Sequence, residues 1–138
     1  MNERSIYITQ HDLDRLEELI AVARKADTLD MDYLDQLDEA LLAKTSIGSR
    51  AVPPDVVTMN SRVRLGDPLT GQSQVYTLVF PADADAAAGR ISVLAPLGTA
   101  MLGAGCGQTI EWVAGGSARR LRVEEILYQP EAAGDFHL

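Results

Sequence analysis

The sequence predicts an α+β fold in which an antiparallel helical hairpin, a short coiled coil, precedes an antiparallel β-sheet that carries one short helix. Residues 10–44 repeat apolar side chains at helical spacing, whereas residues 56–67 alternate apolar and polar side chains as a strand does. Pro53-Pro54 separates the two patterns. We therefore assign three parts to the chain: a helical arm at residues 1–47, a linker at 48–55 and a sheet domain at 56–138.

The arm is expected to contain two amphipathic helices. Thr9 is suited to cap the first, at residues 10–25, because its hydroxyl accepts a bond from a free N–H of the first turn, and Asp12 completes an imperfect capping box. The apolar face of this helix consists of Leu13, Leu16, Leu19, Ile20, Val22 and Ala23. A second helix is expected from its cap at Asp30 to about Lys44, with a stripe at Met31, Leu34, Leu37 and Leu41. The two stripes are expected to pack against each other.

The segment from Val56 to Asp67 predicts the first strand of the sheet domain. Its buried face is expected to consist of Val57, Met59, Ser61, Val63 and Leu65. Residues 45–55 before it contain Gly48 and Pro53-Pro54, which indicate a connecting segment that is stiff at its end.

The remaining sheet elements are predicted from shorter patterns. Residues 74–80 are apolar on both faces, which favours a central strand covered on both sides. Gly115-Gly116 predicts a hairpin turn, and a change of parity at Glu124-Glu125 predicts a β-bulge. Pro96 suits the first position of a short helix at 96–102. Other segments are expected as follows: strands at 91–94, around Ile110 and Trp112, and from Leu121 to Tyr128; a loop or helical turn at 81–89; and a tail at 129–138, anchored if Phe136 packs.

The charge of −8 argues against direct binding of duplex DNA or RNA, which requires a basic surface. Much of the acid lies between Asp12 and Asp38, and the second half holds Arg62, Arg64, Arg119, Arg120 and Arg122. No run approaches the roughly 18 apolar residues of a membrane span, and the first residues lack the apolar core of an export signal. With a single cysteine, Cys106, a reducing cytoplasm is the expected setting.

No pattern for catalysis or metal binding is evident. His11 and His137 lie at opposite ends of the chain, Cys106 has no partner motif, and no nucleophile elbow occurs. The glycine-rich run 103–107 is followed by a strand pattern rather than a helix, so we interpret it as a tight turn and not as a phosphate loop. We assign no catalytic residue, metal or cofactor.

The tip of the arm carries the acidic cluster Asp27, Asp30 and Asp32. One interpretation is that Asp30 caps the second helix while the others are solvated, since acidic residues are favoured at helix N-termini. The alternative is that two of these carboxylates share a divalent cation with an acidic site on a partner.

Three segments resemble the Gre-type transcription factors, and in particular their Rnk branch, the regulators of nucleoside diphosphate kinase. The segments are Asp55–Val63, Ala95–Gly103 and Tyr128–Asp135. The resemblance implies an FKBP-like second domain and a cytoplasmic, bacterial, monomeric protein that binds RNA polymerase near its secondary channel. It also implies that Ala95, Pro96 and Leu97 contact polymerase. Helix initiation and core packing are the alternative roles of Pro96 and Leu97.

The short arm limits which function of the Gre factors this chain is expected to share. Gre factors carry an acidic pair at the tip of a long arm, which Asp27 and Asp30 resemble in type and spacing. Here each helix has only four or five turns, so we do not expect transcript cleavage. The leading hypothesis is a non-enzymatic regulator that occupies the polymerase site and competes with longer-armed factors. The alternatives are an FKBP-like prolyl isomerase and a cleavage-stimulating factor that uses Asp27 and Asp30.

Overall fold

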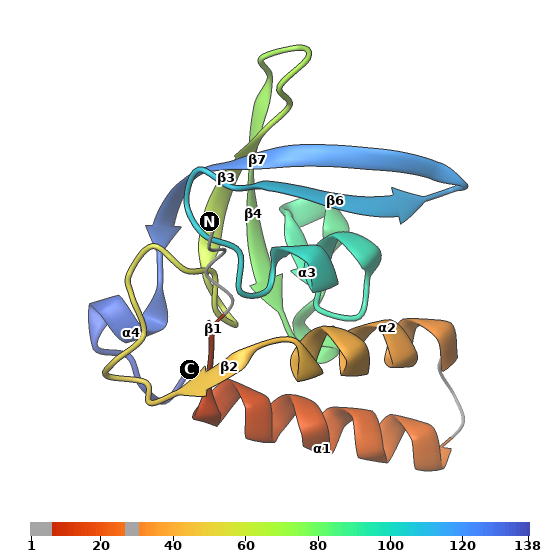
Figure 1. Cartoon of the computed structure of the whole chain (residues 1–138), viewed down its shortest axis with the longest axis vertical. Coiled ribbons are helices and arrows are strands. Elements are labelled where there is room, and N and C mark those ends of the chain that lie inside the picture. The colour runs from red at the N-terminus through yellow and green to blue at the C-terminus, as the bar shows by residue number, and fades with distance from the viewer. Residues whose placement is uncertain (1–6, 27–30) are drawn as a thin grey trace.

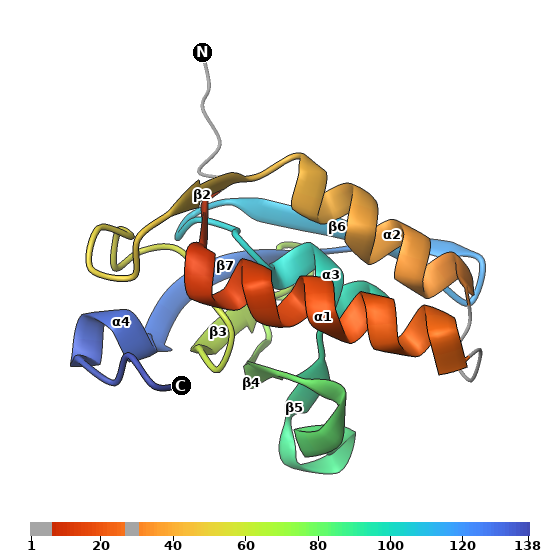
Figure 2. The same ribbon diagram turned by 90° about the horizontal axis from the view of Figure 1, so that it is seen from below.

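The computed structural model describes residues 7–26 and 31–138. Its N-terminal part consists of β1 (Tyr7–Thr9), α1 (Gln10–Ala26), α2 (Met31–Leu42) and β2 (Thr45–Ile47). The sheet domain consists of β3 (Arg62–Gly66), β4 (Ser73–Val79), β5 (Arg90–Ser92), α3 (Pro96–Met101), β6 (Thr109–Ala114), β7 (Ser117–Tyr128) and α4 (Pro130–Ala133), with short 3-10 turns η1 (Pro81–Asp83) and η2 (Ala86–Ala88). Figures 1 and 2 show the helical hairpin along the side of the sheet domain that carries α3.

The five-stranded sheet has the order β5-β4-β3-β7-β6, with β3 at its centre. All neighbours are antiparallel except β4 and β5, and a separate parallel pair of β1 and β2 closes the base of the hairpin. The predicted α+β class, a helical hairpin followed by an antiparallel sheet with one short helix between strands, is confirmed. The pairing of β2 was not predicted, because three residues at the start of a linker carry no strand pattern.

Helix α1 begins where its capping signal predicts. The Thr9 hydroxyl accepts a hydrogen bond of 3.0 Å from the Asp12 N–H. Leu16, Ile20 and Ala23 are buried, but Val22 is 60% exposed, so its assignment to the apolar face was wrong. Val22 lies about 200° around the helix from Ile20, because each residue turns the helix by about 100°.

One continuous hydrophobic core joins the hairpin to the sheet. It contains Leu16, Ile20, Leu34, Leu37 and Leu41 from the helices, together with Met59, Val63, Leu65, Leu78 and Met101 from the sheet domain. The predicted leucine stripe of α2 is therefore buried, and it faces the sheet domain as well as α1.

The predicted strand from Val56 was wrong for its first six residues. Only β3 is strand; residues 58–61 form a turn, in which Asn60 has a left-handed backbone with φ 69°. Val57 and Met59 are nevertheless fully buried. Val56 and Thr58 are buried as well, so the predicted alternation of buried and exposed side chains does not hold here. This irregular segment is covered on both sides and is hydrogen-bonded to the rest of the domain, for example from the Gly103 N–H to the Val57 carbonyl at 2.9 Å.

Residues 129–138 are more ordered than a tail. The Gln129 side chain caps α4 by accepting a bond of 3.1 Å from the Ala132 N–H, and Gly134 ends the helix with φ 82°. Phe136 packs under the Arg50 guanidinium, 4.5 Å from its ring centre, so the expected anchor is present.

Several smaller sheet predictions were tested by the structure. Strand β4 is buried only near its end, at Leu78 and Val79, while Val75 is 43% exposed, so its predicted coverage on both sides was wrong over its first half. The Gly115-Gly116 turn is confirmed, with positive φ at both residues. Register shifts between β3 and β7 confirm a bulge at Glu124 and add a second at Leu127.

Candidate partner-binding site

The start of α3 is held rigidly against the end of β5. Pro96 occupies the first helical turn, as predicted, and the Thr99 hydroxyl donates a bond of 2.7 Å to the Val93 carbonyl. A Cβ on Gly98 would lie 2.0 Å from the Ser92 carbonyl oxygen, so only glycine permits this approach. The preceding Ala95, and Pro96 and Leu97, are half-buried. Helix initiation and exposure to a partner are therefore compatible for these residues.

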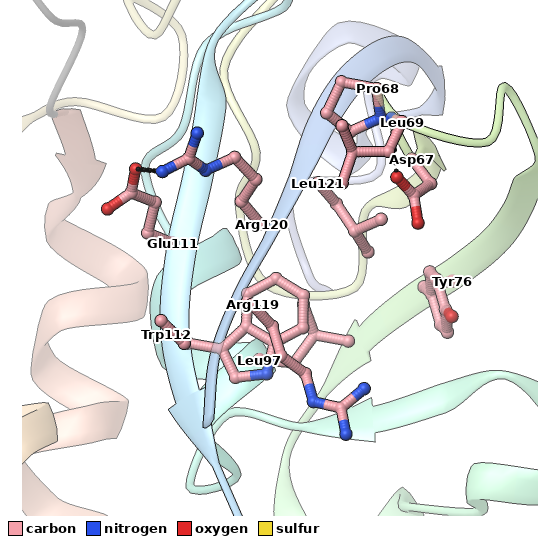
Figure 3. A pocket seen from close by; sticks show the side chains of 11 residues that line it. Asp67, Pro68, Leu69, Tyr76, Leu97, Glu111, Trp112, Arg119, Arg120 and Leu121 are labelled. Atoms are coloured by element: carbon pink, nitrogen blue, oxygen red, sulfur yellow. Dashed lines mark hydrogen bonds and ion pairs between the residues drawn. The ribbon is translucent and has the colours of Figure 1, made fainter. Parts of the chain in front are cut away.

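A hollow of about 670 Å³ opens beside Leu97 (Figure 3). Its lining comes from β4, the turn after β3, α3 and the hairpin of β6 and β7. The apolar and aromatic residues of the lining are Pro68, Leu69, Tyr76, Leu97, Trp112, Ala118 and Leu121. Trp112 and Arg119 are cross-strand partners, which places Arg119 next to the indole and on the same face as Leu121.

A second hollow, of about 610 Å³, lies on the other side of α3. Pro96, Thr99 and Ala100 border it, with Tyr33 of α2 and Val113 of β6 opposite. Leu97 thus faces the first hollow and Pro96 the second, while Glu111 and Trp112 contribute to both. The segment predicted to contact a partner is the ridge between two concave surfaces.

A buried carboxylate connects α1 to the sheet domain. Asp12 is 0% exposed; one oxygen accepts a bond of 3.0 Å from the Met59 N–H and the other a bond of 2.6 Å from Arg15. Burial raises the pKa of Asp12, and its bonds to Met59 and Arg15 oppose the rise. Arg15 also donates 2.6 Å to the backbone oxygen of Leu138 and lies 4.7 Å from the ring centre of Phe80.

A second carboxylate lies close to this junction. Glu131 of α4 accepts a bond of 2.6 Å from the Thr58 hydroxyl, and burial raises the pKa of Glu131. We name Asp12, Arg15, Met59, Thr58 and Glu131 the junction cluster. Sequence reasoning missed its role, although Asp12, Leu16 and Ile20 fall four residues apart and so share one helix face.

The other residues considered from sequence are not brought to this site. Asp27 and Asp30 lie outside the described residues, and Asp32 is exposed in the first turn of α2. Within residues 7–26 and 31–138 there is no group of three or more His, Cys, Asp or Glu able to hold a metal. In the run 103–107, the N–H groups of Gly103, Gly105 and Gly107 already donate to other parts of the chain. No helix of the described segments is long and apolar enough to span a membrane.

Comparisons with known proteins agree with this architecture. Residues 52–128 match the family described as transcription elongation factor GreA/GreB, C-terminal, and residues 4–42 match the Rnk N-terminus. The regulator of nucleoside diphosphate kinase of Escherichia coli K12 is 39% identical over all of both chains. GreA of Chelativorans sp. BNC1 is 30% identical over 77% of this chain and 68% of its own. A GreA/GreB elongation factor structure from Nitrosomonas europaea superposes with a TM-score of 0.73 and 36% identity, over 89% of this chain and 99% of that one.

A helical hairpin followed by an antiparallel sheet, matched over more than half of the chain by one family model, is an architecture of the GreA/GreB family. The chain belongs to the GreA/GreB family, and its match to the Rnk N-terminus places it in the Rnk branch of regulators. The resemblance found in the sequence is confirmed.

Proposed function

We propose that this protein is a non-enzymatic transcription regulator that acts in the cytoplasm and binds RNA polymerase near its secondary channel. The observation that supports the proposal most directly is the ridge at Ala95–Leu97, half-buried and bordered by two hollows. Relatives of the chain are named transcription elongation factors, for which polymerase is the natural partner. The sheet domain would supply the docking surface and the hairpin would lie toward the channel.

The helical hairpin is short and lies against its own domain. At 1.5 Å per residue, α1 with 17 residues is about 25 Å long and α2 with 12 residues is about 18 Å long. Because α2 also packs on α3, little of this length projects beyond the sheet domain. We therefore propose that the protein occupies the polymerase site and competes with longer-armed Gre factors, without stimulating transcript cleavage.

The direct test is a competition experiment with purified RNA polymerase and a Gre factor. We expect the wild-type protein to displace the Gre factor and Ala95→Asp to bind about tenfold more weakly. Aspartate is a favourable residue at this N-cap position, so the substitution should not destabilise α3. Ala86→Asp, at an exposed alanine of η2, is the matched control. Absence of any wild-type binding would refute the proposal.

Two enzymatic roles provide contrasting outcomes. The hollow beside Leu97 contains the aromatic side chains of Tyr76 and Trp112, which favours testing for prolyl isomerase activity. We expect none in a peptide isomerisation assay, because charged side chains make up much of the remaining lining. We likewise expect no RNA cleavage in backtracked complexes; cleavage that Asp30→Ala abolishes would instead support the tip acids as metal ligands.

A further inference from the structure

Apolar side chains form part of the wall of the hollow beside Leu97, and the chain itself does not fill it. Leu97, Trp112 and Leu121 are only partly buried although they pack against the core. Leu69, at the rim of the same hollow, is 93% exposed. Apolar side chains from four separate segments thus converge on one concave surface, which is the geometry that receives an apolar side chain of a partner.

Some of the charged side chains around this hollow already have partners within the described parts of the chain, and one does not. Glu111 is paired with Arg120 at 3.1 Å, and the Asp67 carboxylate accepts bonds of 2.8 and 3.4 Å from the Leu69 and Thr70 N–H groups of its own turn. Across residues 7–26 and 31–138, no ion pair or hydrogen bond involves the Arg119 guanidinium. Arg119 is therefore a cation at the mouth of the hollow whose side-chain donors have no acceptor among the described residues, whereas the Asp67 oxygens already accept from their own turn, in a chain whose net charge is −8.

Resting on the function proposed above, we propose that the docking surface of RNA polymerase presents an apolar side chain next to a carboxylate. The apolar side chain enters the hollow between Leu97, Trp112 and Leu121, and the carboxylate pairs with Arg119. The pairing is complementary in charge, and it gives a protein of net charge −8 a positive group with which to bind a carboxylate. Arg119 then sets the orientation of the complex and the salt dependence of binding.

The charge is tested by substitution on one strand. We expect Arg119→Glu to weaken binding to purified RNA polymerase about tenfold at low salt, because the new glutamate would face the partner's carboxylate and repel it. Arg122→Glu is the matched control: Arg122 is also exposed and without an ion pair among the described residues, but it lies on the opposite face of β7. We expect its affinity to stay within about twofold of wild type. Arg119→Ala should bind with a shallower dependence on salt.

The apolar contact is tested at the rim. Leu69→Ser removes a side chain that supports nothing in the fold, so we expect unchanged stability and about fivefold weaker binding, the effect of losing part of one buried apolar contact. Leu42→Ser, at a leucine 83% exposed near the end of α2, should bind as wild type does.

The outcomes separate this inference from the function on which it rests. If wild-type protein does not bind polymerase, the proposed function fails. If it binds and Ala95→Asp weakens it, but Arg119→Glu and Leu69→Ser bind normally, polymerase docks on the ridge without using this hollow and the inference alone is overturned. Equal losses for Arg119→Glu and Arg122→Glu would also overturn it, because net charge alone would then explain the effect.

Discussion

Asp12 is a charged side chain with no exposed surface, and its environment explains why it is tolerated there. Its two oxygens accept from the Met59 N–H and from Arg15, so each oxygen of the buried carboxylate has a hydrogen-bond donor. Removing the carboxylate leaves a buried backbone N–H without an acceptor, which is costlier than losing the net value of the bond.

We therefore expect Asp12→Ala to lower the free energy of unfolding by about 2–3 kcal/mol. Asp12→Asn retains an oxygen for the Met59 N–H and should cost less. Urea unfolding, followed by the fluorescence of the sole tryptophan, Trp112, measures both. Asp14→Ala, at an exposed position on the same helix, is the control and should change little. Equal stability of Asp12→Ala and Asp14→Ala would contradict the assigned role.

The pKa of Asp12 predicts the sign of a pH effect. Burial raises this pKa in the folded protein above its unfolded value, so the folded state binds the proton more tightly. The stabilisation that comes from this tighter proton binding at Asp12 is fully present below the unfolded pKa, and it is lost as pH rises through the folded pKa. The stability of wild type relative to Asp12→Asn should increase as pH falls from 7 toward 4, measured by urea unfolding at each pH. His11, Arg15 and Glu131 are near enough to influence Asp12 and are unchanged in both proteins, so a difference that decreases toward pH 4 would reject the prediction.

Among the secondary structure elements, α3 packs closely against the end of β5 at Gly98. The Gly98 Cα lies so close to the Ser92 carbonyl that an added methyl group must push the helix away from β5. We expect Gly98→Ala to cost about 1–3 kcal/mol and, by displacing the ridge at Ala95–Leu97, to weaken polymerase binding. Gly48→Ala, where nothing lies within 4 Å of the added carbon, should leave both stability and binding unchanged in the same thermal and competition assays.

Elements with a complete local signal were predictable from sequence, and those assembled from distant segments were not. Thr9 with the leucines after it defined α1, and Gly115-Gly116 defined a hairpin, because each signal lies within a few residues. The turn at residues 58–61 was taken for strand. Local bonds between Thr58 and Ser61 close it, but those residue types also occur in strands, and the bonds that fix its place come from Asp12 and Leu78, remote in sequence. The candidate site shows the same division. Resemblance to a family identified Leu97, whereas the roles of Trp112 and Arg119 depend on a surface that four segments build only after folding.

For the whole molecule, the shared core predicts cooperative unfolding. Leu37 of α2 is fully buried in the cluster that contains Met59 and Leu78. Leu37→Ala should lower stability by about 3 kcal/mol and shift the transitions of helix ellipticity and Trp112 fluorescence together. Leu42→Ala, at an exposed leucine of the same helix, is the control. A Trp112 transition that stays in place while the helices unfold at lower denaturant would show that the arm and the sheet domain fold independently. The linker between them, at residues 48–55, remains a prediction.

The junction cluster bears on how arms of different length can be exchanged among relatives. On the sheet domain, the group that meets Asp12 is a backbone N–H, which any residue at position 59 except proline would offer. The requirement for a particular side chain therefore falls on the hairpin alone. A longer hairpin grafted onto this sheet domain should pack most stably if it carries both the apolar face of this hairpin and an acidic residue in its first turn at the place of Asp12, and less stably if the acidic residue is missing.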